Sequence, residues 1–283
     1  DTDYDEVVLL ACKGGHLELV NMMLSLGATC YNWGLYHACY RGHNEIVKMM
    51  LSLGANVYDS GLIDACKGGH IEIVKMMLDL GANEYNEGLY YACESGNIEI
   101  VKMMLDLGAN DYNKGLSGAC KGGHNEIVKM MLDLGANDYN RGLEHACYGG
   151  HIEIIKILLS YTNDYIWGLN GACKGDNLEI VKWMFEFMPN DYDCGILVNN
   201  IIYYNCNTNI EIIKMLINRS ANNYGPLCCG NLECKIMYIR LTNKTLNRID
   251  KLPIKTEHPE YHLLNVYNKC IPDIDRLINK YLY

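Results

Sequence analysis

The chain has 283 residues, of which 49% are apolar, and a formal net charge of −10 at pH 7. This length admits one large domain or two ordinary ones, and no apolar run reaches the roughly 18 residues of a membrane-spanning helix, so we expect no membrane association. Residues 1–234 carry a net charge of −14 and residues 235–283 carry +4. Because so acidic a body repels phosphate groups, we also expect no binding to nucleic acid.

A period of 27 residues organises the chain from its N-terminus. Cysteines repeat at this spacing, at Cys12, Cys39, Cys66, Cys93, Cys120 and Cys147. A tyrosine column follows the same period, at Tyr4, Tyr31, Tyr58, Tyr85, Tyr112 and Tyr139. Internal periods of this length are typical of solenoids, in which each unit buries its apolar face only by stacking on its neighbours. We predict that the tyrosine rings stack and close one edge of the solenoid.

The pattern within one period predicts two short helices. In GLYHACYRG, residues 34–42, Leu35, Ala38 and Cys39 share one helix face. In HNEIVKMMLSL, residues 43–53, the apolar residues again share one face, and the following GAN ends the helix at a Gly. Fourteen Cys without an N-terminal signal region indicate a reducing compartment. We therefore predict that the cysteine column is buried filler rather than a disulfide or metal ladder.

A His-x-Glu motif opens each second helix and could be mistaken for chemistry. Such a pair can belong to a zinc-assisted hydrolytic site, where the Glu moves protons. Here the His recurs in register, at His16, His43, His70, His124 and His151, and is replaced by Asn97 and Asn177 in two units. An active site does not occur five times in one chain. The motif therefore predicts architecture, and we expect no enzyme, no catalytic residue and no cofactor.

The motif G-H-x-E-I-V-x-x-x-L-x-x-G-A-N resembles the ankyrin repeat, with Ala-Cys in place of its usual Ala-Ala. A leucine-rich repeat would also match LSLGAN, but Lys48 stands where that repeat needs an apolar residue. The unit departs from the ankyrin pattern in two ways: Gly34-Leu35 replaces the T-P-L-H start, and the period is about six residues shorter than the usual ~33. The loss falls where the family's β-hairpin finger would project. This short-finger form is similar to the ankyrin arrays of mimivirus-type giant DNA viruses of amoebae.

The resemblance covers roughly residues 1–224 and implies an all-α, ankyrin-like helix-turn-helix solenoid. We predict an array of about eight units with short or absent β-hairpin fingers in residues 1–224. Residues 225–283 are predicted to form a degenerate last repeat and a helical C-terminal capping module. The chain begins with Asp rather than Met, so we expect a fragment, and the apolar VVLL of residues 7–10 would leave an unsealed N-terminal end through which copies could self-associate.

One alternative for the C-terminal module is a metal site. Its candidate zinc ligands are Cys228, Cys229, Cys234, His258 and His262. The gap of 23 residues between the last Cys and the first His fits no familiar zinc finger, and Cys serves as filler elsewhere in the chain. We therefore expect no metal, and the zinc site stays an open alternative.

Differences between the repeats indicate where a partner would bind. They concentrate just before Gly-Leu, just after it, and just after Ala-Cys. The resemblance implies that these positions line the concave groove of the stack, where ankyrin repeats contact partners, and Tyr, Trp and Arg carry much of the energy of protein interfaces. Drift on a tolerant surface is the alternative. The predicted partner-binding residues are Trp33, Tyr36, His37, Tyr40, Arg41, Ile63, Asp64, Lys67, Tyr90, Tyr91, Glu94, Glu144, His145, Tyr148 and Trp167.

The function implied is a non-enzymatic protein-protein interaction scaffold, engaging host or viral proteins of unknown identity in the host cytoplasm, with the nucleus as an alternative. A second hypothesis is a substrate adaptor of a ubiquitin ligase. It comes from a resemblance to poxvirus ankyrin proteins, which implies a C-terminal F-box-like module, and LPIKTEHPEYHLLNVYNKC from Leu252 is faintly similar to one.

Overall fold

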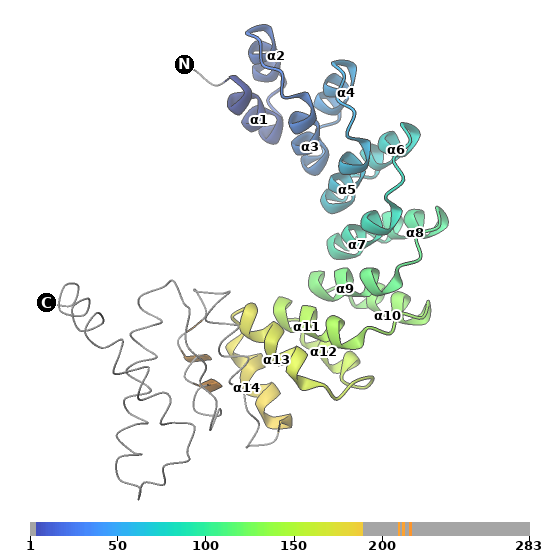
Figure 1. Cartoon of the computed structure of the whole chain (residues 1–283), viewed down its shortest axis with the longest axis vertical. Coiled ribbons are helices and arrows are strands. Elements are labelled where there is room, and N and C mark those ends of the chain that lie inside the picture. Colours follow the sequence, from blue (N-terminus) through green and yellow to red (C-terminus); the bar gives the residue numbers. More distant parts are fainter. Residues whose placement is uncertain (1–3, 189–208, 210, 213–214, 217–283) are drawn as a thin grey trace, which may run out of the picture. The chain divides into compact units, whose positions relative to one another are not determined.

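The computed structural model describes residues 4–188, 209, 211, 212, 215 and 216 (Figure 1). The described helices are α1 (Tyr4–Gly14), α2 (Leu17–Ser25), α3 (Tyr31–Arg41), α4 (Asn44–Ser52), α5 (Tyr58–Gly68), α6 (Ile71–Asp79), α7 (Tyr85–Ser95), α8 (Ile98–Asp106), α9 (Tyr112–Gly122), α10 (Asn125–Asp133), α11 (Tyr139–Gly149), α12 (Ile152–Leu158), α13 (Tyr165–Lys174) and α14 (Leu178–Phe187). No strand occurs among these residues, and the prediction of an all-α helical solenoid is confirmed.

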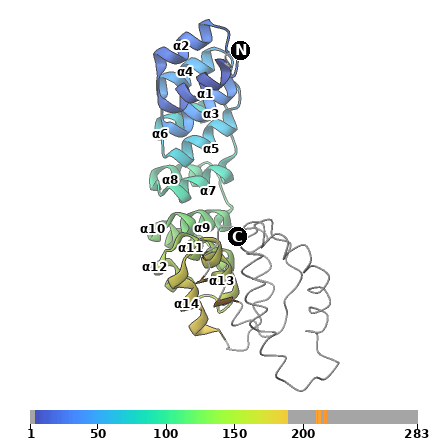
Figure 2. The same cartoon turned by 90° about the vertical axis from the view of Figure 1, so that its left-hand side faces the viewer.

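The helices alternate between two layers. We call the odd-numbered helices first helices and the even-numbered ones second helices, and among α1–α8 the two kinds lie in separate layers (Figures 1 and 2). From α1 to α9, each first helix packs against the first helix of the next repeat, and from α1 to α11 each packs against the second helix of its own repeat. The chain divides into two compact units between Gly171 and Ala172, inside α13. No helix among the described residues is long and apolar enough to cross a bilayer.

The predicted domain boundary at residue 224 lies beyond the main described range. Seven helix pairs are described, ending with α13 and α14. The unit predicted after them, apart from a few residues of its second helix, lies outside the described residues. The capping module of residues 225–283, its zinc ligands and its F-box-like segment lie outside them as well, so all of these stay predictions.

The same positions of each repeat form the apolar core. In the second repeat, Leu35, Ala38 and Cys39 from α3 and Val47 and Met50 from α4 are each 0% exposed. Burial raises the pKa of the Cys39 thiol to about 12, so it stays protonated at neutral pH. Cys12, Cys39, Cys66, Cys93 and Cys120 are free cysteines. The prediction that the cysteine column is buried is confirmed, since its six members from Cys12 to Cys147 are each 0% exposed.

The repeated His joins each second helix to the preceding repeat. Nε2 of His70 donates to the backbone oxygen of Tyr40 over 3.1 Å. In the next repeat Asn97 also reaches back one repeat, but to a different carbonyl: its Nδ2 donates to the backbone oxygen of Gly69, directly after α5, over 3.2 Å. The other histidines that reach back one repeat in this way are His43, His124 and His151. Each of the histidine bonds also satisfies a carbonyl in the last turn of a first helix, which the helix itself leaves without a partner.

The accompanying Glu serves the surface. Glu45 pairs with Lys48 three residues later over 3.1 Å, and both side chains are well exposed. Exposed pairs of this kind contribute only about 0–1 kcal/mol to stability. The His-x-Glu motif therefore places its two residues in different structural roles, one between repeats and one on the solvent side of the helix.

Side chains at the start of each first helix close the short links between repeats. Oδ1 of Asn86 accepts hydrogen bonds from the backbone N–H groups of Asn110 and Asp111, at 2.8 and 2.9 Å. The side chains that do the same at other links are Asp5, Asn32, Asp59 and Asn113. Each follows a member of the tyrosine column, where we predicted stacked rings. Tyr139 does stack, but on Tyr161 of the next link, with ring centroids 4.9 Å apart. Polar side chains, rather than a ring column, bridge these links.

Two glycines at equivalent positions differ in whether a histidine ring packs against them. Gly42 and Gly69 both have positive φ, +79° and +76°. A Cβ on Gly42 would lie 2.5 Å from Cε1 of His70, whereas one on Gly69 would meet only Nδ2 of Asn97 at 3.6 Å. We expect Gly69→Ala to cost only the left-handed backbone penalty of about 1–2 kcal/mol, and Gly42→Ala to cost distinctly more. Urea unfolding followed by circular dichroism measures both, and equal losses would show that the ring contact is not restrictive.

Candidate functional site

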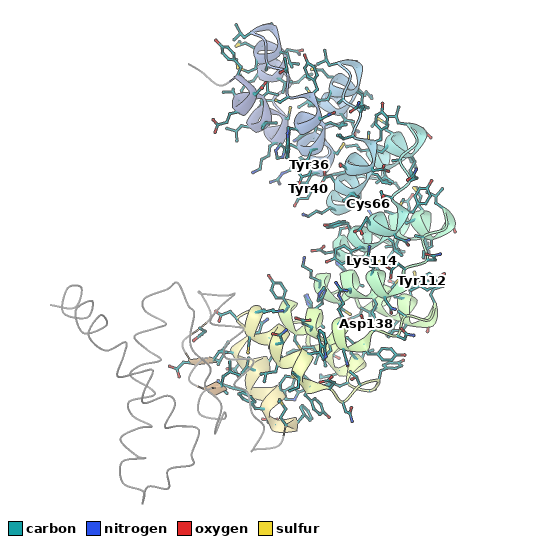
Figure 3. The ribbon with its side chains drawn as sticks, viewed as in Figure 1. Tyr36, Tyr40, Cys66, Tyr112, Lys114 and Asp138 are labelled. Carbon is teal, nitrogen blue, oxygen red and sulfur yellow. The ribbon has the colours of Figure 1, made fainter. Side chains whose placement is uncertain are left out.

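The predicted contact residues all lie on first helices. They are distributed over α3 (Trp33, Tyr36, His37, Tyr40, Arg41), α5 (Ile63, Asp64, Lys67), α7 (Tyr90, Tyr91, Glu94), α11 (Glu144, His145, Tyr148) and α13 (Trp167). We call their side chains, together with those of Lys114, Ser117 and Lys121 on α9, the first-helix face. Tyr36, Tyr40 and Lys114 lie along the layer of first helices in Figure 3. Trp33 and Tyr148 are exposed, at 62% and 46%, and the tyrosines of α3 and α7 are half-buried.

Aromatic rings on α3 form a connected cluster. The centroids of Trp33 and Tyr36 are 6.1 Å apart, and those of Tyr36 and His37 are 5.1 Å apart, both in edge-to-face geometry. The guanidinium of Arg41 lies 5.2 Å from the ring centroid of Tyr40. Edge-to-face pairs and cation–π contacts each contribute about 0.5–1.5 kcal/mol beyond simple burial. Half-buried rings held in this way are largely ordered before any partner arrives.

Lys67 continues this cluster across two repeats. Its Nζ lies 5.5 Å from the ring centroid of Tyr40 on α3 and 5.5 Å from that of Tyr91 on α7. Tyr91 in turn meets Tyr90 edge to face at 4.9 Å. The cation therefore stands between rings from the two neighbouring first helices. Sequence reasoning named these residues separately, and the structure brings them together into one strip.

Ion pairs between repeats occupy the middle of the face. Lys114 of α9 pairs with Glu87 of α7, and Lys121 pairs with Glu94 over 2.8 Å. Glu87, Lys114 and Lys121 are not among the predicted contact residues. Their signal was nevertheless present in the sequence, because each Glu–Lys pair holds opposite charges 27 residues apart. Next to them, Oγ of Ser117 lies 2.9 Å from Nδ1 of His145.

Gly118 lets α9 approach the backbone of α7 closely. A Cβ at this position would lie 2.3 Å from the backbone oxygen of Tyr90. Most of the other repeats carry a larger side chain here, such as His37, Asp64 or Tyr91, whereas the repeat of α13 again has a glycine, Gly171. The first-helix face is therefore uneven, with bulky rings on α3 and α7 and little beyond backbone at Gly118. A partner that binds this face must match its uneven shape. The sequence differences between repeats therefore determine the shape of the surface that a partner would meet.

Asp64 requires a correction. We predicted a surface contact, but the residue is only 4% exposed, and its Oδ2 has no hydrogen-bond partner among the described residues. Burial raises the pKa of this carboxyl to about 7, although nearby Lys67 acts to lower it. The position is buried because it precedes the Ala-Cys pair that packs against the neighbouring first helix. A short side chain there points into the layer, whereas the longer rings of its counterparts reach the surface.

The first-helix face offers aromatic and charged contact groups. Among the described residues no three His, Cys, Asp or Glu side chains are grouped as a metal site. Burial raises the pKa of the Cys66 and Cys93 thiols to about 12, which leaves them unreactive at neutral pH. Burial also lowers the pKa of His37, and the charges of Lys13 and Arg41 lower it further. His37 is thus neutral at physiological pH and contributes an aromatic surface rather than a charge.

Comparison with known proteins supports the resemblance seen in the repeats. Residues 35–115, from within α3 to within α9, match the family model described as Ankyrin repeats (3 copies). No curated protein matches the chain. The matched region holds three repeats and contains the aromatic strip from Tyr36 to Tyr91. The giant-virus, short-finger subtype has no support from a relative and rests on the motif alone.

The buried carboxyl of Asp64 predicts a specific pH dependence. Its pKa is raised from 3.8 to about 7 in the folded state, so the folded chain binds a proton that the unfolded chain releases. Stability contributed by this group is therefore present below pH 4 and is lost as the pH rises to about 7. At about 1.4 kcal/mol per pH unit, the loss amounts to a few kcal/mol. We expect Asp64→Asn to be more stable than the parent at pH 8 and similar to it near pH 4.

Urea unfolding of both proteins across this range measures the difference. Asp79→Asn, at the exposed end of α6, supplies the matched control and is expected to stay within about 0.5 kcal/mol of the parent at pH 8. A parent and an Asp64→Asn variant with parallel pH curves would contradict the assignment of Asp64 as a destabilising buried acid.

Proposed function

From a stack that contains three ankyrin repeats, we propose that this chain is a non-enzymatic scaffold that binds a protein partner through its first-helix face. Ankyrin repeats generally mediate protein-protein interaction, and proteins built from them are typically not enzymes. The concave groove implied by the resemblance corresponds to the layer of first helices. The single observation that carries the proposal is the strip of Tyr40, Lys67 and Tyr91, in which one cation lies 5.5 Å from two rings on adjacent first helices.

Two physical properties of the strip support a binding role. Its rings are partly exposed and already held by edge-to-face and cation–π contacts, so that little side-chain entropy would be lost on association. Tyr, Trp and Arg also supply most hot spots in protein interfaces. The second-helix layer differs, because its exposed side chains are mainly Glu and Lys, paired within one helix as at Glu45 and Lys48. Such pairs contribute little to stability or recognition.

We further propose, from the short-finger motif, that the protein belongs to a giant DNA virus and acts in the cytoplasm of an amoebal host. The motif resemblance is the support for this part of the proposal. The ubiquitin-ligase alternative depends on the segment from Leu252, outside the described residues, and no observation of the structure favours it.

The test is a quantitative pull-down from cell lysate with the parent and a Tyr36/Tyr40/Tyr90/Tyr91→Ala variant. We expect a partner captured by the parent to be lost by the variant, since four Tyr removed from one interface typically cost several kcal/mol. A Leu53/Leu80/Leu107/Leu134→Ala variant is the matched control, because these four leucines are 41–43% exposed and follow the second helices. Circular dichroism must show native helix content in both. Equal capture by all three proteins would place the binding site elsewhere.

A further inference from the structure

Unpaired cations gather at the N-terminal part of the first-helix face. Lys13 on α1, Arg41 on α3 and Lys67 on α5 occupy the last turns of three successive first helices. None of them forms an ion pair with a carboxylate among the described residues. On α9, by contrast, Lys114 and Lys121 are neutralised by acids of α7. The positive charge of this region is therefore open to an external group.

Two of these cations contact aromatic rings of the first helices. Arg41 and Lys67 lie 5.2 and 5.5 Å from the ring centroid of Tyr40, and Lys67 reaches Tyr91 as well. The charge of Lys13 on α1 acts on His37 of α3 together with that of Arg41, so α1 and α3 share one electrostatic environment. We call Lys13, Arg41, Lys67, Tyr40 and Tyr91 the basic aromatic patch.

Local acids do little to cancel this charge. Asp64, one turn before Lys67, is buried, and its raised pKa leaves it partly protonated near neutral pH. Glu94, in the matching slot on α7, is paired with Lys121. The rest of the body is strongly acidic, with a net charge of −14 over residues 1–234. A basic patch on such a body is unexpected from composition, and it is complementary to anionic rather than cationic groups.

We propose that the basic aromatic patch binds an acidic peptide segment of the partner protein, with its Asp or Glu carboxylates on Arg41, Lys67 and Lys13 and its apolar side chains against Tyr40 and Tyr91. This proposal rests on the proposed function and adds the chemistry of the partner. Arg presents a planar fork that matches a carboxylate, and the rings hold both cations in place before binding. A long polyanion such as nucleic acid fits less well, because the acidic body would repel it beyond the patch at low salt, where the Debye length is largest.

The experiment uses the full chain and a fluorescent peptide of alternating Glu and Leu around a central Trp, with binding followed by anisotropy. The matched probe carries Gln in place of every Glu. We expect the Glu peptide to bind at least tenfold more tightly than the Gln peptide, and its affinity to fall as salt is raised. Arg41→Gln/Lys67→Gln is expected to weaken the Glu peptide about tenfold, the combined effect of two partly exposed charge contacts.

A Lys48→Gln/Lys75→Gln variant provides the control. It changes the net charge by the same amount on the second-helix layer and is expected to leave the affinity within about twofold. Equal binding of the Glu and Gln peptides, or equal weakening by the two double variants, would overturn the proposal. So would tight binding of single-stranded DNA through the same residues.

The two experiments distinguish a failure of the proposed function from a failure of the acidic-peptide chemistry. If the Tyr36/Tyr40/Tyr90/Tyr91→Ala variant loses its partner while Arg41→Gln/Lys67→Gln keeps it, the face binds protein but the acidic-peptide chemistry is wrong. If neither variant loses the partner and the Glu peptide also fails to bind, both the proposed function and its chemistry are wrong.

Discussion

The contact between successive first helices is the constraint from which the rest of this structure follows. A single helix pair exposes its apolar face, and only a neighbour placed at the same height and angle can cover it. Small residues such as Ala38 and Cys39 let the helices approach, and they are fully buried. The histidine bond from His70 to Tyr40 then joins the polar ends of the two repeats. Because every repeat makes this same contact, one pattern of apolar and polar residues serves for all the interfaces between repeats.

Surface chemistry varies where this contact leaves freedom. Positions facing the neighbour hold the same letters in almost every repeat, whereas the positions beside them carry Tyr, Lys, Glu, His or Gly. The structure shows that these variable positions interact across repeats, as Lys67 does with Tyr40 and Tyr91 and as Lys121 does with Glu94. The face is therefore built from pairs of repeats, and its properties belong to no single unit.

Periodicity was sufficient to predict helices, their pairing and the buried cysteines, because each depends on local pattern and on stacking. It was also sufficient to place the variable residues on one layer. It could not predict that Asp64 is buried while Tyr91, one repeat later, reaches a cation, since that outcome depends on side-chain length against a neighbouring helix. The prediction that the tyrosine column closes the links has a similar explanation. The residue after each Tyr bridges the link, as Asn86 does, and it repeats with the same period as the Tyr. Regular spacing alone therefore does not show which of the two side chains makes the contact.

The hydrogen bonds between repeats also dictate how such a chain can change its length. The rings of His43, His70, His124 and His151 each reach a carbonyl 30 residues earlier. The backbone amides of most links meet a side-chain oxygen 24 or 25 residues earlier, as those of Asn110 and Asp111 do. A single inserted residue inside one unit would shift one partner of these bonds and leave the other behind. Copying a whole unit of 27 residues shifts both partners together and supplies a new, complete set. Growth and loss by entire units therefore preserve every bond, while the variable positions of the new copy become free to acquire a different partner.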